Sequence, residues 1–188
     1  FKIASFEITD IPLIKAVAYK QKPVIISTGI ATEIDIQEAI DACKSVGNEQ
    51  IALLKCTSAY PTRLEEVHLR GIHTLRDKFN CVVGLSDHTE GSLVPVGATA
   101  LGGKIIEKHF ILKRDLGGPD ASFSMEPQEF KKMVKEVRNM EKALGNRDLI
   151  VSKKVEKNRQ FARSLYIVKD IKIGEKLTSE NLRSIRPG

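Results

Sequence analysis

Apolar and polar positions follow one repeating pattern along most of the chain, in which a short apolar run precedes a longer segment with apolar residues at helical spacing. The expected strands are residues 2–5, 23–27, 51–55, 81–85 and 104–108. The expected helices are residues 12–20, 32–46, 66–79, 91–101 and 127–144. Because nearly continuous apolar strands alternate with helices, the pattern predicts a parallel sheet that helices cover.

Two of the expected helices carry start or stop signals. The spacing of Thr32 and Asp35 suits a capping box, and Gly47 ends the helix that follows. The apolar positions of this helix are expected at Ile34, Ala39, Ile40 and Cys43. The last helix is closed by Gly145, and its apolar side is formed by Phe130, Met133, Val134, Val137 and Leu144.

The character of the sequence changes after Gly145. We expect a βα domain over residues 1–145, a polar and basic linker over 146–160 and the start of a second domain over 161–188. The last segment contains an expected strand at 163–168 and is too short for a core of its own. Five βα units do not close an eight-stranded barrel. The pattern therefore fits two architectures, an open sheet and the later part of a (β/α)₈ barrel.

Composition narrows the class of protein. The hydrophobic fraction of 41% supports a packed core, and the net charge of +6 is too modest to predict nucleic-acid binding. No apolar run approaches the roughly 20 residues that span a bilayer. The chain opens on an apolar strand without Met, so we expect no signal peptide and a piece of a longer protein. Cys43, Cys56 and Cys81 lack metal-ligand spacing and predict reduced thiols in a cytoplasmic protein.

Two histidines follow neighbouring expected strands. His88 lies in LSDHT at 85–89 and His109 in EKHF at 107–110, one strand–helix–strand unit apart. Since parallel strands end at the same edge of a sheet, the two imidazoles are expected to converge there, with Asp87 and Glu107 around them. Such a group could hold one divalent metal ion, and the alternative is a pair of hydrogen-bonded structural histidines.

Other polar residues also gather where the expected strands end. They are Lys2, Ser5 and Glu7, then Ser27, Thr28 and Gly29, then Cys56, Thr57 and Ser58, then Ser86. Lysine, hydroxyl and backbone N–H groups in one bowl suit a phosphate or a carboxylate. The loop 117–124 presents Asp120 over the same mouth and suggests a substrate contact. The structural alternatives are turn and cap roles, such as a helix cap for Glu7.

An ordered set of segments resembles a known family. KIAS…E, STG, LLKCTSAYP, GLSDHT, ALG…IIEKHF and GGPD…S resemble the sialic acid synthase family, whose members condense phosphoenolpyruvate with an amino sugar. The resemblance covers essentially the whole chain, and the tail from residue 163 is similar to the start of the family's antifreeze-like (SAF) domain. ASFEITD, LLKCTSAYP and GGPDASFS are most similar to the pseudaminic acid synthases within it.

The resemblance implies a fold and a set of site residues. The fold would be α/β, with about five βα units from the C-terminal part of a (β/α)₈ (TIM) barrel, followed by the truncated SAF domain. His88 and His109 match metal ligands, for Mn²⁺ or else Mg²⁺ or Co²⁺. The residues that match phosphoenolpyruvate contacts are Lys2, Ser5, Ser27, Thr57, Ser58 and Ser86. The residues that match active-site carboxylates are Glu7 and Glu107, and those that match sugar contacts are Asp120 and Arg186.

The implied reaction joins phosphoenolpyruvate to 2,4-diacetamido-2,4,6-trideoxy-altrose and releases phosphate by C–O cleavage. Arg186 would reach the active site of the other subunit in a domain-swapped homodimer. Three alternatives stay open. They are an N-acetylneuraminate or legionaminate synthase, a barrel aldolase with a Schiff-base lysine such as Lys55 or Lys108, and an inactive sugar-binding fragment.

Overall fold

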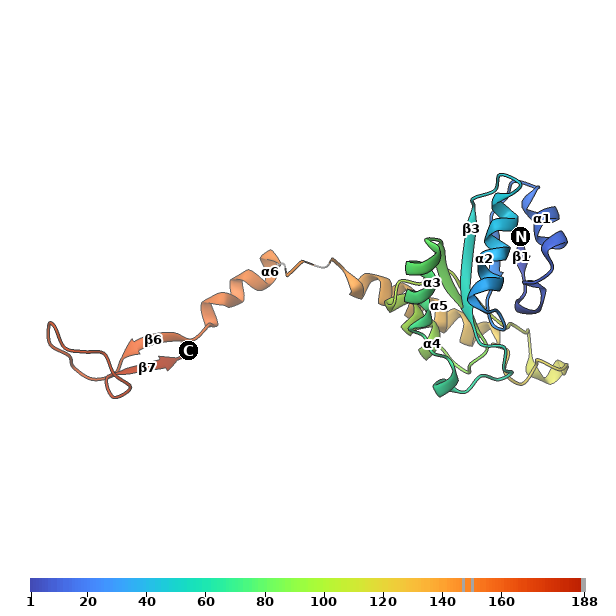
Figure 1. Ribbon diagram of the computed structural model, residues 1–188. Coiled ribbons are helices and arrows are strands. Elements are labelled where there is room, and N and C mark those ends of the chain that lie inside the picture. Colours follow the sequence, from blue (N-terminus) through green and yellow to red (C-terminus); the bar gives the residue numbers. More distant parts are fainter. Residues whose placement is uncertain (147, 150, 187–188) are drawn as a thin grey trace. The chain divides into compact units, whose positions relative to one another are not determined.

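A computed structural model describes residues 1–146, 148–149 and 151–186. The chain divides into two compact units, Phe1–Gly145 and Asn146–Gly188 (Figure 1). No helix in these described ranges is long and apolar enough to cross a membrane.

The first unit is built on a five-stranded parallel sheet in which the strands lie in chain order. Its strands are β1 (Lys2–Ile3), β2 (Val24–Ser27), β3 (Ile51–Cys56), β4 (Val82–Asp87) and β5 (Ile106–Lys108). Its helices are α1 (Ile11–Ala18), α2 (Glu33–Lys44), α3 (Gly71–Phe79), α4 (Leu93–Ala100) and α5 (Pro127–Leu144). Short 3₁₀ turns, η1 (Ser5–Glu7), η2 (Leu64–Glu66) and η3 (Arg114–Leu116), lie between them. The predicted alternation of strands and helices in a parallel sheet is confirmed.

A contact between the outermost strands shows that this sheet is curled. The Nζ atom of Lys2 in β1 lies 3.5 Å from Oε1 of Glu107 in β5. In a flat sheet, four spacings of about 4.8 Å would hold these strands about 19 Å apart, which is farther than a lysine and a glutamate bridge. The sheet therefore curls toward the face that carries both side chains, as half of a barrel does.

The two faces of the sheet differ in chemistry. Side chains that alternate along the strands pack with the helices in one apolar core, and the strand residues of this core include Ile3, Val24, Ile26, Ile51, Leu53, Val83 and Leu85. The opposite face carries the polar residues at the carboxyl ends of the strands, namely Lys2, Ser27, Cys56, Ser86 and Glu107. The pairing register puts Ser86 beside Cys56 and Glu107, so these three side chains share that face.

Helix α2 shows how local sequence signals act, and where one failed. Oγ1 of Thr32 accepts a hydrogen bond from the Asp35 N–H at 3.3 Å, and the Asp35 carboxylate accepts from the Thr32 N–H at 2.8 Å, which confirms the predicted capping box. The buried side includes Ile36, Ala39, Ile40 and Cys43. The predicted burial of Ile34 is wrong, because it points away from that side and is 71% exposed.

Helix α3 begins later than the sequence predicted. The expected helix starts at residue 66, whereas α3 begins at Gly71 after the separate turn η2. His68 lies between them with a φ of 47°, in the left-handed region that a right-handed helix excludes. Strands β3 and β4 extend farther than expected, so Cys56, Ser86 and Asp87 lie within paired strands.

The second unit contains α6 (Lys153–Glu156), η4 (Lys157–Phe161) and an antiparallel pair of β6 (Ser164–Ile167) and β7 (Leu182–Ile185). The strand expected at 163–168 is confirmed. The polar and basic linker expected over 146–160 stays a prediction, and a short helix forms within it, where Ser152 caps α6 by accepting from the Val155 N–H. In the described part of this unit only Asn181 is buried. Its identity as the start of an SAF domain stays a prediction.

Candidate active site

The two predicted histidines lie side by side. His88 and His109 each follow the last paired residue of β4 and β5, and their ring centroids are 5.2 Å apart with an interplanar angle of 68°. His88 is 6% exposed. The structure thus brings together the imidazoles that the sequence placed at one edge of the sheet, and their role as metal ligands stays a prediction.

Neighbouring groups fix the orientation of His88. Its Nδ1 atom lies 2.8 Å from the carbonyl oxygen of Thr57, so Nδ1 carries the proton and donates, while Nε2 is left for a ligand. Burial, the largest single influence, lowers the pKa of His88, but the Cys56 thiol and the Thr57 carbonyl together raise it above its ordinary value. The Thr57 backbone therefore holds His88 in the tautomer that a metal ligand needs.

His109 lies in a different electrostatic environment. Burial, followed by the nearby charge of His88, lowers its pKa, and these influences outweigh the opposing charges of Asp120 and Glu107. Oδ2 of Asp120 lies 3.6 Å from Nδ1 of His109. Asp120, the loop residue expected to contact a sugar, therefore lies beside the ring of His109, which was expected to bind a metal.

Two aromatic rings that the sequence analysis missed surround the histidines. The Tyr60 ring centroid lies 4.3 Å from that of His88, and the Phe123 centroid lies 5.0 Å from that of His109. The two aromatic rings are 5.9 Å apart, and Phe123 is 5% exposed. Two signals were available, since Tyr60 lies in the LLKCTSAYP segment after β3 and Phe123 lies in the loop over the mouth. Together the rings form an apolar wall beside the imidazoles.

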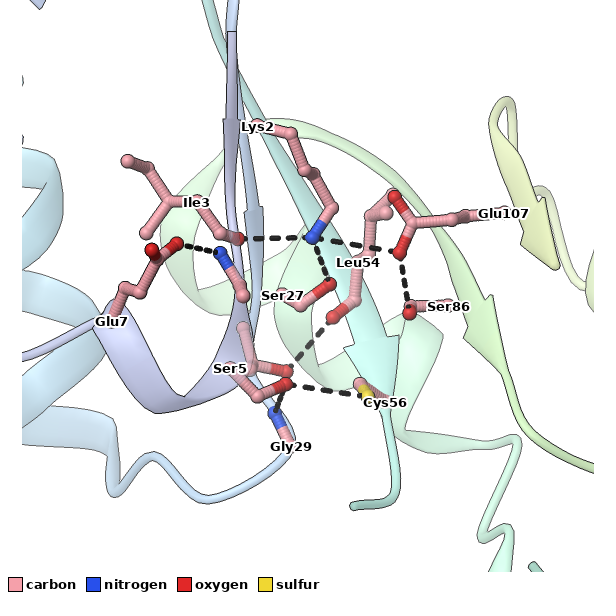
Figure 2. A network of polar contacts seen from close by, with 12 residues as sticks. Lys2, Ile3, Ser5, Glu7, Ser27, Gly29, Leu54, Cys56, Ser86 and Glu107 are labelled. Carbon is pink, nitrogen blue, oxygen red and sulfur yellow. Dashed lines mark hydrogen bonds and ion pairs between the residues drawn. The ribbon is translucent and has the colours of Figure 1, made fainter. Parts of the chain in front are cut away.

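A polar network from four strands occupies the same concave face. Figure 2 shows the Lys2 ammonium donating to Oγ of Ser27 at 2.8 Å and to the Ile3 carbonyl at 3.0 Å. The same ammonium faces the Glu107 carboxylate, which accepts from Oγ of Ser86 at 2.7 Å. One cation, one carboxylate and two hydroxyl groups therefore converge from β1, β2, β4 and β5.

A second polar cluster forms around Gly29. Its N–H donates to Oγ of Ser5 at 3.0 Å, and that hydroxyl donates to the Cys56 sulfur at 3.4 Å (Figure 2). A methyl group on Gly29 would lie 2.2 Å from Oγ of Ser58, so only glycine fits. Oγ of Ser58 is buried without a hydrogen-bond partner among the described residues. A buried hydroxyl of this kind marks a place where a ligand or water completes the site.

The Cys56 thiol in this cluster is electrostatically unusual. Burial is the largest single influence and raises its pKa, but hydrogen bonds with His88 and Ser5 outweigh burial and lower the pKa overall. The Cys56 sulfur accepts from the Ser5 hydroxyl, and the thiol also raises the pKa of His88, so the polar cluster and the histidine pair are contiguous.

Several predicted site residues have other surroundings. Glu7 is exposed, and its carboxylate accepts from the Ala4 N–H at 2.7 Å, so it caps its own turn η1. The Thr57 hydroxyl is held by Lys55 and by the Glu66 carbonyl, each at 3.2 Å, and only its backbone supports the site. Arg186 belongs to the second unit, where its guanidinium lies 5.9 Å from the Phe161 ring centroid.

Three charged residues on the strands face the helices instead of the pocket. The expectation that Asp87 flanks the histidines is wrong, because its carboxylate pairs with Lys108 at 2.7 Å. Burial lowers the pKa of Lys55, whose ammonium donates to the Cys56 carbonyl and whose stem lies against Gly71 of α3. A lowered pKa would favour a nucleophilic amine, but both lysine side chains point away from the pocket face, which disfavours a Schiff-base role for Lys55 or Lys108.

The donor groups around the two histidines fit an open metal site better than a closed one. Across the residues that the structure describes, no group of three or more His, Cys, Asp and Glu side chains is arranged to hold one. Two imidazoles at 5.2 Å between centroids, one with Nδ1 bonded to a carbonyl, nevertheless suit an open site. In such a site the substrate and water supply the other ligands.

The NeuB family profile matches residues 1–148. The chain belongs to this family, the sialic acid synthases. It is 50% identical over 187 residues to pseudaminic acid synthase from Campylobacter jejuni, covering 100% of this chain and 54% of that protein. It is 49% identical over 188 residues to pseudaminic acid synthase from Helicobacter pylori, covering 100% and 55%. The chain thus spans about half the length of these curated relatives, and the family predicted from the sequence is confirmed.

Solved structures agree with this placement. The N-acetylneuraminic acid synthetase of Leptospira borgpetersenii, solved in complex with citrate, superposes with a TM-score of 0.78 at 36% identity. The match covers 85% of this chain and 56% of that chain. The chain therefore has an α/β fold in which a curled parallel sheet forms half a barrel.

Proposed function

We propose that this chain is part of a pseudaminic acid synthase, which joins phosphoenolpyruvate to 2,4-diacetamido-2,4,6-trideoxy-altrose. The observation that carries the proposal is the convergence of the Lys2 network and the His88–His109 pair on one concave face. The identities of 50% and 49% to two pseudaminic acid synthases support the choice of sugar.

The residues around Lys2 and Gly29 bind phosphoenolpyruvate in this proposal. Its phosphate and carboxylate are anions, and the site offers an ammonium group, the hydroxyls of Ser5, Ser27, Ser58 and Ser86, and the Gly29 backbone. Donors that are fixed before the substrate arrives stabilise developing charge without further reorganisation. Thr57 contributes through its carbonyl bond to His88.

The reaction balances as a condensation with loss of phosphate. C3 of phosphoenolpyruvate forms a bond to the aldehyde carbon of the open-chain sugar, and the aldehyde oxygen gains a proton. Water adds to the cation left at C2, and the C–O bond to phosphate then breaks. Glu107, held by Ser86 and Lys2, orients the water or a sugar hydroxyl as a general base. Glu7, whose carboxylate caps η1, stays a predicted second carboxylate with no step assigned to it.

His88 and His109 hold a divalent cation in this proposal, with Mn²⁺ preferred over Mg²⁺ or Co²⁺. Such an ion, when bound, polarises the aldehyde oxygen as a Lewis acid. Tyr60 and Phe123 exclude water from one side of the pair, and Asp120 beside His109 binds a sugar hydroxyl. Arg186 completes the sugar site from the other subunit of a domain-swapped dimer.

A second candidate differs only in the sugar. The chain is 43% identical over 190 residues to N,N'-diacetyllegionaminic acid synthase from Campylobacter jejuni, which covers 57% of that protein. A legionaminate or N-acetylneuraminate synthase would use the same anion-binding residues. The expected cytoplasmic location, and the expectation of neither nucleic-acid nor membrane partners, stay predictions.

One assay tests the proposal and separates the candidates. The complete gene product is supplied with phosphoenolpyruvate and Mn²⁺, and the diacetamido-altrose, the legionaminate precursor and N-acetylmannosamine are offered in parallel while phosphate is measured. Of the three sugars, we expect only the diacetamido-altrose to support phosphate release. We also expect that borohydride does not trap a substrate covalently on the protein. Release with another sugar would select the second candidate, and no release with any of them would contradict a synthase.

A further inference from the structure

One buried ion pair lies between the residues of the proposed site. Nζ of Lys108 is 2.7 Å from Oδ2 of Asp87, and the two side chains are 1% and 2% exposed. We infer that Asp87 and Lys108 are positioning residues that set the spacing of His88 and His109. This inference rests on the proposed function, since it concerns the same pair of imidazoles.

The register of β4 and β5 gives the pair this position. Ser86 pairs with Glu107, and Asp87 pairs with Lys108, in consecutive steps of the ladder. Because side chains alternate along a strand, the first step faces the pocket and the second faces the helices. The residue that follows each strand is one of the two histidines. The ion pair is therefore the last paired step between β4 and β5 before the imidazoles.

Asp87 and Lys108 also hold the chain beyond His88. The Asp87 carboxylate accepts from the Thr89 N–H and from the Thr89 hydroxyl, both at 3.0 Å. The Lys108 ammonium donates to the Thr89 carbonyl. Thr89 is 1% exposed. The backbone is therefore fixed on both sides of His88, and β5 is tied to the same point through Lys108.

The stability of this buried region does not by itself require an ion pair. Replacing both members of a buried pair by apolar residues of similar volume is often neutral for stability, whereas removing one member leaves an unpaired buried charge. An Asp87→Leu/Lys108→Met double variant therefore tests positioning apart from folding, because it keeps the packing but loses every bond to Thr89. Leu85, buried two residues before Asp87 on the same face, supplies the matched control Leu85→Ala.

The experiment measures Mn²⁺ affinity by electron paramagnetic resonance of free Mn²⁺, with circular dichroism melting on the same samples of the complete gene product. We expect the double variant and Asp87→Asn to bind Mn²⁺ at least tenfold more weakly than wild type, about the effect of losing a group that orients a metal ligand. Leu85→Ala should lower the melting temperature and keep the wild-type affinity.

Three results would overturn the inference, and they are distinguishable. Wild-type affinity in a folded double variant, or an equal loss of affinity in Leu85→Ala, would overturn the positioning role alone. Absence of Mn²⁺ binding by the wild-type protein would overturn the proposed metal site and the inference with it.

Discussion

Lys2 and Glu107 join the two edges of the sheet through one ion pair of 3.5 Å on its concave face. The same ammonium group is held by Ser27, and the same carboxylate by Ser86. A cation that is half-buried and held by three oxygens is well placed to exchange one of them for a phosphate or carboxylate oxygen of a substrate. This relationship ties the curl of the sheet to the chemistry of the site.

Replacing Lys2 by Met should weaken phosphoenolpyruvate binding. A hydrogen bond to a charged group contributes about 1.5–3 kcal/mol, which is about a 10- to 150-fold rise in KM. Steady-state phosphate release by the complete gene product measures it. Lys20→Met is a suitable control, because Lys20 is exposed at the end of α1. A KM that is equal in the two variants would remove Lys2 from the substrate site.

Replacing Gly29 by Ala should disrupt the part of the phosphoenolpyruvate site that Ser5 and Ser58 form. The added methyl group would lie 2.2 Å from Oγ of Ser58 and 2.8 Å from Oγ of Ser5, so both hydroxyl groups must move. We expect at least a tenfold loss of kcat/KM for phosphoenolpyruvate. Gly97→Ala in α4 is the control, since its methyl group meets only the end of the Leu69 side chain at 3.0 Å. Equal activity of both variants would show that the Gly29 cluster does not bind substrate.

The cap of α2 makes a prediction about stability and pH. Thr32→Ala removes the hydroxyl that caps the helix and should cost about 0.5–2 kcal/mol of unfolding free energy at pH 7. The Thr32 hydroxyl, followed by its backbone N–H, holds the pKa of Asp35 below its ordinary value of 3.8. The ionised carboxylate therefore stabilises the fold above that value, and this contribution is lost as pH falls through the lower folded pKa.

Denaturant unfolding at several pH values checks this prediction. The difference between wild type and Thr32→Ala should be full near neutral pH and smaller in acid. A difference that does not change as the pH falls would mean that the carboxylate does not take part in the cap. Glu38→Gln, which changes an exposed carboxylate farther along α2, serves as the control for general charge effects.

Much of the first unit could be predicted from the sequence because its signals are local. Helix α5 has the predicted bounds, since Pro127 and Gly145 mark its ends. Local signals failed where one backbone conformation decided the outcome, as at His68 before α3. The partial helix in the expected linker formed because Ser152 caps it, although most of the segment is polar.

The site was predictable to the extent that strand ends determine it. The spacing of two βα units placed His88 and His109 together, but the apolar wall of Tyr60 and Phe123 depends on how two loops fold over the strands. The orientation of Asp87 was accessible from alternation once β4 was known to reach it.

The most direct test of the central claim compares bound Mn²⁺ and turnover in His88→Ala, His109→Ala and His73→Ala forms of the complete gene product. His73 lies on α3, away from the pocket face, and is the matched control. The account predicts that the first two variants lose stoichiometric Mn²⁺ and metal-dependent phosphate release, while His73→Ala keeps both. Bound Mn²⁺ with unchanged turnover in His88→Ala or His109→Ala would contradict it.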